Sequence, residues 1–154
     1  FYSTGIRLSE LVGLKWVDVD IEGGELKVLG KRNKQRIVPF GEELQQAFKA
    51  FFELQCREMG RSVEQIFVRA DGKPLRPDEV RAIVKKYLSL VTKQQKRSPH
   101  VLRHTYATVM LNNGADLEAV KQLLGHESIS TTEVYTHTTF SELKKEYKKA
   151  HPRA

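Results

Sequence analysis

Cysteine is almost absent from this chain: Cys56 is the only one among 154 residues. One thiol cannot form an internal disulfide, and it rules out a zinc site built from several cysteines. Chains with so little cysteine are typical of a reducing compartment, so we expect the protein in a cytoplasm.

Long apolar runs are missing as well. No segment approaches the roughly 20 consecutive apolar residues of a transmembrane helix, so we expect no membrane span, and the start of the chain shows no charged-then-apolar signal segment. Hydrophobic residues make up 40% and charged residues 29% of the chain, which indicates a folded globular protein. Since domains average roughly 100–200 residues, the length indicates one domain with a core of its own.

Acidic residues are in deficit. Asp and Glu number 19 against 26 Lys and Arg, which gives a formal net charge of +7. This surplus favours an anionic partner, with nucleic acid as the first candidate. Charge alone does not decide the matter, because many basic proteins bind no nucleic acid.

Hydrophobic periodicity predicts an α+β fold, mostly α-helical, with a small antiparallel β-sheet near the N-terminal part. Helical spacing and capping residues predict helices over 8–14, 41–59, 77–91, 98–112 and 116–124, another opened by a capping box at Ser130, and a charged tail helix over about 141–149. Alternation predicts extended segments at 17–21, 26–29 and 37–39, and a short strand at 66–68 before the Asp71-Gly72 turn.

Two clusters near the front could carry chemistry. Arg7 and Glu10 are spaced i, i+3 and therefore share a helix face, where a surface ion pair is the ordinary interpretation. The second cluster is a basic hairpin that holds five cations within ten residues and no acid: Lys27, Lys31, Arg32, Lys34 and Arg36. Such a loop is most often simply solvated, but it would also suit tracking of phosphates, with one lysine as a proton donor.

The third cluster lies in the last third of the chain. His100 and Arg103 share one helix face, and His100 and His104 have the i, i+4 spacing of zinc-binding helices. A metal site is disfavoured, because no Glu follows His100, no thiol is near, and Arg103 would repel a cation. Farther along stand His126 and Tyr135, and an isolated tyrosine at a helix end is most often a half-buried aromatic.

Taken together, these clusters resemble the catalytic domain of the tyrosine recombinases, the phage integrase family. The segments that carry the resemblance are "TGIRLSELVGL", "GKRNKQRIVPF", "SPHVLRHTYAT" and "LLGHESISTTEVYTH", and the likeness extends over essentially the whole chain. The ending "HPRA" is similar to the bacterial Xer-type subgroup. The family's N-terminal DNA-binding domain has no counterpart here, so residues 1–154 are expected to be the catalytic domain alone.

The resemblance implies a role for each matching residue. It makes Arg7 and Arg103 the clamp on the scissile phosphate, Lys31 the proton donor, and Tyr135 the nucleophile that forms a 3′-phosphotyrosyl link. The remaining implied residues are His100 and His126 at the phosphate and nucleophile, and Glu10 in support. The basic hairpin and the basic segment 93–104 add expected DNA contacts, at Lys27, Arg32, Lys34, Arg36, Lys96 and Arg97. Guanidinium groups are permanently charged and bidentate, so they can stabilise the charge that builds up on phosphorus without a metal or any other cofactor.

The implied activity is site-specific cutting and rejoining of double-stranded DNA, without ATP, by a homo- or hetero-tetramer of recombinase subunits on two DNA sites. Chromosome dimer resolution of the Xer type is the first expectation, and an integrase of a mobile element is the alternative. A type IB topoisomerase is a less favoured alternative. A non-enzymatic DNA binder is the third, because residues 99–113 and 116–124 resemble a helix-turn-helix.

The tail is the last expectation. Its charged helix has only a narrow apolar stripe, formed by Leu143 and Tyr147, and helices this short are marginal on their own. We therefore expect residues of about 140–154 to dock in a groove. Exchange onto a neighbouring subunit is what the resemblance implies, and docking on the same domain is the alternative.

Overall fold

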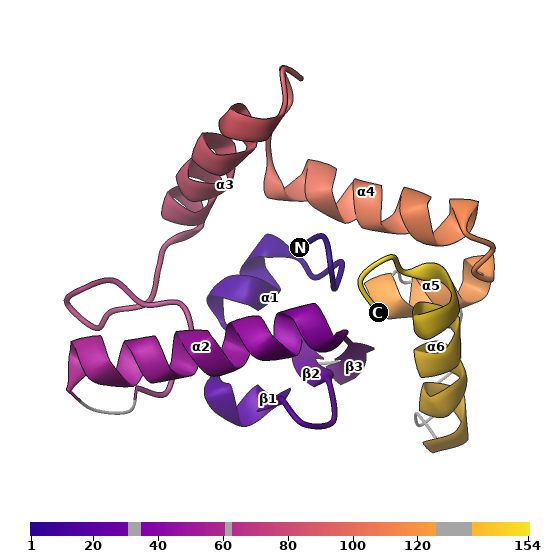
Figure 1. Cartoon of the computed structure of the whole chain (residues 1–154), viewed down its shortest axis with the longest axis horizontal. Helices are drawn as coiled ribbons and strands as arrows, with labels where there is room; N and C mark the ends of the chain where they lie inside the picture. The colour runs from indigo at the N-terminus through magenta and orange to yellow at the C-terminus, as the bar shows by residue number, and fades with distance from the viewer. Residues whose placement is uncertain (31–34, 61–62, 126–136) are drawn as a thin grey trace.

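A three-stranded antiparallel sheet lies among helices in the computed structural model (Figure 1), which describes residues 1–30, 35–60, 63–125 and 137–154. The strands are β1 (Val19–Asp20), β2 (Glu25–Leu29) and β3 (Gln35–Pro39), in the order β1-β2-β3. Side chains alternate between the two faces of a strand. Leu26 and Val28 of β2 are therefore buried, as are Arg36 and Val38 of β3.

The helices follow the predicted segments closely. They are α1 (Leu8–Val12), the short 3-10 helix η1 (Trp16–Asp18), α2 (Glu42–Met59), α3 (Pro77–Val91), α4 (Pro99–Asn112), α5 (Leu117–Leu124) and α6 (His137–Ala150). The α+β prediction is thus confirmed. The helix expected at Ser130 lies outside the described residues. Within the described part of the chain, no helix is long and apolar enough to cross a lipid bilayer.

The core falls into two clusters. Leu14, Leu26, Val38 and Phe48 belong to the first, which joins the sheet to α1, α2 and α3. The second joins α4, α5 and α6, with Tyr106, Met110, Leu123, Leu143 and Tyr147 among its members. Strand β3 contacts both α5 and α6, so it connects the two halves.

The extended segment predicted at 17–21 is mostly wrong. Trp16 begins η1 instead, because its ring packs against Phe48 and Phe52 and its indole N–H donates to Gln55 over 2.7 Å. Val17 is consequently 80% exposed, and the strand shrinks to Val19–Asp20. The contacts of a large aromatic side chain here outweigh a weak period-2 pattern.

The strand predicted at 66–68 does not form either. In its place there are two isolated antiparallel β-bridges, one between Lys15 and Gln65 and one between Val68 and Pro74. Pro74 has no N–H to donate, so the pairing around the Asp71-Gly72 turn cannot extend into a ladder.

The tail helix α6 packs against its own chain. Leu143 and Tyr147 are buried in the second cluster, and the phenol of Tyr147 donates to the Ser3 carbonyl over 3.2 Å. The Lys144 ammonium lies 3.0 Å from the Glu25 carboxylate. In a single chain the tail therefore docks on its own domain, and exchange within an assembled complex stays a prediction.

Leu143→Ala tests this docking in solution. Leu143 is 4% exposed, and removing a buried leucine side chain typically lowers the free energy of unfolding by about 2–5 kcal/mol. Leu117→Ala is the control, because Leu117 is 52% exposed on α5. Urea unfolding followed by circular dichroism measures both. Equal stability of the two variants would mean that α6 does not dock on its own domain.

Candidate active site

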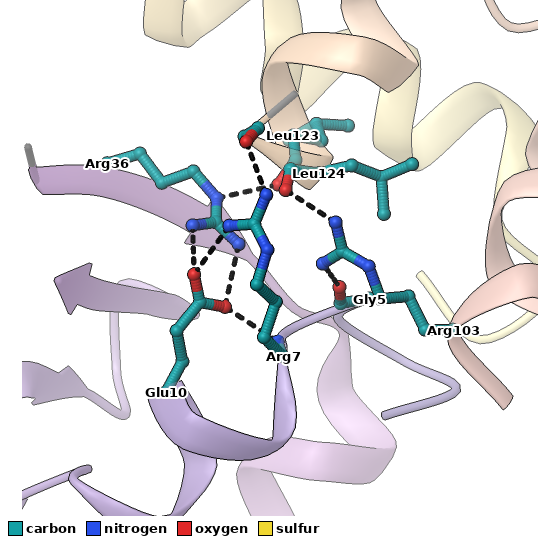
Figure 2. Close-up of polar contacts among 8 residues, drawn as sticks. Gly5, Arg7, Glu10, Arg36, Arg103, Leu123 and Leu124 are labelled. Carbon is teal, nitrogen blue, oxygen red and sulfur yellow. Dashed lines mark hydrogen bonds and ion pairs between the residues drawn. The ribbon is translucent and has the colours of Figure 1, made fainter. Parts of the chain in front are cut away.

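Three arginine side chains meet at the C-terminal end of α5 (Figure 2). Arg7 is the residue that immediately precedes α1, Arg36 lies on β3 and Arg103 lies on α4. The last carbonyls of a helix have no partner within it and carry its negative end. Each arginine donates to one of them: Arg36 Nε to Leu123 over 2.9 Å, Arg103 Nη2 to Leu124 over 2.7 Å, and Arg7 Nη2 to Gly125 over 2.5 Å.

The local sequence explains why α5 ends there. The Asp116 carboxylate caps its start by accepting the Ala119 N–H, and Gly125 ends it in the left-handed region, at φ +65°. A Cβ on Gly125 would also lie only 3.0 Å from the Arg36 guanidinium. Glycine is therefore favoured at this position both by the turn and by the close approach of the arginine.

A buried carboxylate joins two of the arginines. Glu10 accepts from Arg36 through both oxygens, at 2.6 and 3.0 Å, and from the Arg7 guanidinium at 3.0 Å and backbone N–H at 2.6 Å. Burial alone would raise the pKa of Glu10, but the hydrogen bonds from Arg36 and Arg7 and the charge of Arg36 outweigh it and hold the pKa below its ordinary value of 4.5. The group is therefore a carboxylate at neutral pH.

Arg103 is held from its other side by the turn before α1. Its Nη1 donates to the Gly5 carbonyl. Gly5 has φ +61°, and a Cβ there would lie 2.6 Å from the Tyr106 ring. Burial, with the charges of Arg7 and Arg36, lowers the pKa of Arg103 to about 10, which leaves it charged at neutral pH.

The cluster has unbalanced charge. Among the described residues, Glu10 is the carboxylate paired with these cations, so three positive charges face one negative charge. The Arg36 side chain is 5% exposed, whereas that of Arg7 is 31% exposed and Arg103 is half-buried. Arg7 and Arg103 thus present guanidinium groups to a ligand, and the arrangement suits an oxyanion such as a phosphate.

The other predicted residues are placed as follows. His100 is exposed in the first turn of α4, one turn before Arg103. Lys27 is exposed on β2, and Lys96 is exposed and Arg97 half-buried between α3 and α4. Five predicted residues lie outside the described residues: Lys31, Arg32, Lys34, His126 and Tyr135. Over the residues that the structure describes, no three His, Cys, Asp or Glu side chains gather closely enough to hold a metal ion.

The DNA contact predicted for Arg36 does not fit the structure. The side chain points inward from β3, opposite Val28, and its guanidinium is bonded to Glu10 and Leu123 rather than open to a phosphate. The sequence held a signal for this. Arg36 lies two residues before the apolar Val38, so both side chains are on the same face of the strand. Because Val38 indicates the buried face, Arg36 is expected to point inward with it.

Known proteins resemble this chain over almost its whole length. The model of the phage integrase family matches residues 1–142. The chain belongs to the phage integrase family. It is 48% identical over 159 residues to the tyrosine recombinase XerC of Chlorobaculum tepidum, which covers 99% of this chain and 47% of that protein. The XerC of Pelotomaculum thermopropionicum is 43% identical over 159 residues, covering 99% and 52%. The chain therefore spans about half the length of the curated relatives that it matches.

Solved structures give the same picture. The XerA recombinase superposes with a TM-score of 0.75 at 33% identity, covering 99% of this chain and 56% of that one. The XerH recombinase, solved bound to its difH substrate before cleavage, gives 0.72 at 26% identity, covering 94% and 42%. These likenesses confirm both the fold and the family that the motifs indicated.

Glu10→Gln tests the charge balance at the centre of the cluster. Breaking a buried ion pair typically costs about 3–5 kcal/mol, so the variant should be less stable than wild type at neutral pH. Because the folded-state pKa of Glu10 is lowered, its stabilisation is complete above the ordinary pKa of 4.5 and is lost as pH falls through the lowered folded value. The difference in urea unfolding free energy should thus shrink in acid. A difference that does not change with pH would contradict an ionised Glu10.

Proposed function

We propose that this chain is the catalytic part of a site-specific DNA recombinase, which cuts and rejoins double-stranded DNA through a 3′-phosphotyrosyl intermediate. The observation that carries the proposal is the convergence of Arg7 and Arg103, one turn from His100, on the end of α5. The two guanidinium groups come from segments about a hundred residues apart and remain partly open to solvent. Two charged bidentate donors can stabilise the negative charge that grows on the non-bridging oxygens when a phosphodiester is attacked.

In the proposed reaction, the Tyr135 oxygen attacks the scissile phosphorus and the bond to the 5′-oxygen of the next nucleotide breaks. Arg7 and Arg103 hold the non-bridging oxygens, whose negative charge grows in the transition state. Lys31 gives a proton to the departing 5′-oxygen, His126 donates to the phosphate, and His100 assists removal of the phenol proton. The tyrosyl ester keeps the energy of the broken bond, so a 5′-hydroxyl from another strand reverses the step without ATP.

The similarity to XerC proteins favours a Xer-type role, namely resolution of chromosome dimers by a homo- or hetero-tetramer on two DNA sites. We place this activity in the bacterial cytoplasm, where the chromosomal substrate lies. A mobile-element integrase remains the alternative with the same chemistry. Lys27, Lys96, Arg97, Arg32 and Lys34 are proposed to contact DNA phosphates around the site.

Covalent capture tests the proposal and finds the target. The protein, in its full length, is mixed with fragmented genomic DNA, denatured, and the fragments covalently bound to it are sequenced. A recurring sequence with two-fold symmetry is the expected result. An exchange assay with two duplexes carrying that sequence separates a recombinase from a topoisomerase, and the complete absence of adducts would leave only a DNA-binding module.

Tyr135→Phe should abolish the covalent adduct on a nicked duplex carrying the captured site and leave DNA binding unchanged, because only the hydroxyl is removed. Tyr87→Phe, at a 62% exposed tyrosine of α3, is the matched control and should form the adduct normally. Gel electrophoresis under denaturing conditions measures both. An adduct that survives in Tyr135→Phe would assign the nucleophile elsewhere.

Salt dependence tests the DNA surface. For this chain alone we expect weak binding with little sequence preference, whose logarithmic slope against salt is about −0.9 per phosphate neutralised. Lys27→Ala should make that negative slope shallower by about 1. Fluorescence anisotropy titrations with DNA over a series of salt concentrations measure the slope. Lys148→Ala removes the same charge from an exposed position of α6 and serves as control. Tight, site-selective and salt-insensitive binding would overturn this expectation.

A further inference from the structure

We propose that Arg36 is a positioning residue for the phosphate clamp: it orients Arg7 through the Glu10 carboxylate while holding the end of α5. This inference rests on the proposed function, because it assigns Arg7 to the phosphate. It gives a role in the reaction to a buried charge that does not itself reach the DNA.

The first step is the shared carboxylate. Arg36 holds both Glu10 oxygens in a bidentate pair, at 2.6 and 3.0 Å, which fixes the plane of the carboxylate. One of these oxygens, Oε1, also accepts from Arg7 Nη1 at 3.0 Å. The orientation of the Arg7 guanidinium is thus set by a carboxylate that Arg36 has already oriented (Figure 2).

The second step is the end of α5. The Nε of the same Arg36 guanidinium donates to the Leu123 carbonyl over 2.9 Å, and Arg7 Nη2 donates to the Gly125 carbonyl, two residues farther on. Arg36 therefore fixes both groups that hold Arg7, the carboxylate on one side and the helix end on the other. Because the guanidinium is a rigid plane, movement of either acceptor would be transmitted to the other.

The residue type matters for this role. Three of the five N–H donors of Arg36 are used, in a planar fork that a lysine ammonium cannot reproduce. Without Arg36, the buried Glu10 would keep only its bonds from Arg7, and its pKa would rise. Arg7 would then lose its ionic partner whenever Glu10 took up a proton.

The test is the rate of adduct formation by Arg36→Met in the full-length protein, on a nicked duplex carrying the captured site. Loss of one clamp donor typically costs about 10²–10³ in rate, and we expect a loss near the lower end, about 10². Arg81→Met, at an exposed position of α3, is the matched control and should react at the wild-type rate.

A neutral phosphate separates positioning from a loss of fold. The same rates are measured with a methylphosphonate at the scissile position, in each of its two stereoisomers, where one charged oxygen is replaced by methyl. If Arg36 acts by aligning Arg7 with that charged oxygen, Arg36→Met should lower the adduct rate, relative to wild type, much less on one stereoisomer than on phosphate. The same fold-loss in rate on phosphate and on both methylphosphonates would overturn the proposal.

Two further readouts follow from the route through Glu10. The first is the pH profile: the adduct rate of Arg36→Met should begin to fall in acid at a higher pH than the wild-type rate does, because the pKa of Glu10 is raised. The second is the double variant: the fold-losses in adduct rate caused by Glu10→Gln and by Arg36→Met should not multiply when the two changes are combined. If Arg36→Met does not unfold cooperatively in urea, Arg36→Lys takes its place in the same comparison. Wild-type protein that forms no adduct overturns the proposed function itself, whereas wild-type rates in the Arg36 variant overturn only this inference.

Discussion

The structure depends on the meeting of three guanidinium groups with the carbonyl end of one short helix. Arg7, Arg36 and Arg103 belong to segments that are distant in sequence, and α5 gives each of them an acceptor. The helix end would otherwise be left with unpaired carbonyls, and the arginines would be held apart by their charges. This one junction closes the domain and also creates its candidate site.

The two core clusters serve that junction. Strand β3 carries Arg36 from the first cluster to α5, while α4 carries Arg103 from the second toward the Gly5 turn. Glycines at positions 5 and 125 let backbone and side chains approach more closely than a Cβ allows. The packing of apolar side chains thus decides where the charges lie.

Most of the fold was predictable from the sequence, because long helices with regular apolar spacing carry a strong signal. The segment at 17–21 was not, since Trp16 packs against aromatic side chains distant in sequence. The strand at 66–68 was not either, although Pro74, whose missing N–H limits the pairing, lies nearby in the sequence. For the site, the motifs identified Arg7, Glu10 and Arg103 correctly as neighbours. They did not separate Arg36 from the other basic residues of its hairpin, because a run of basic residues shows charge but not direction. The period of β3 would have shown that direction.

The surplus of buried positive charge has a consequence for folding. Among the described residues, Glu10 alone balances the three guanidinium groups, so the cluster keeps a net excess of two positive charges. The repulsion between these charges is present in the folded chain but relaxed in the unfolded one. Any anion that enters the cluster removes part of this repulsion and is bound by the folded state alone, so it adds RT ln(1 + [L]/Kd) to the free energy of unfolding. The domain is therefore built to be less stable when empty than when occupied. Its thermal midpoint should therefore rise with the concentration of the polyanion that it binds.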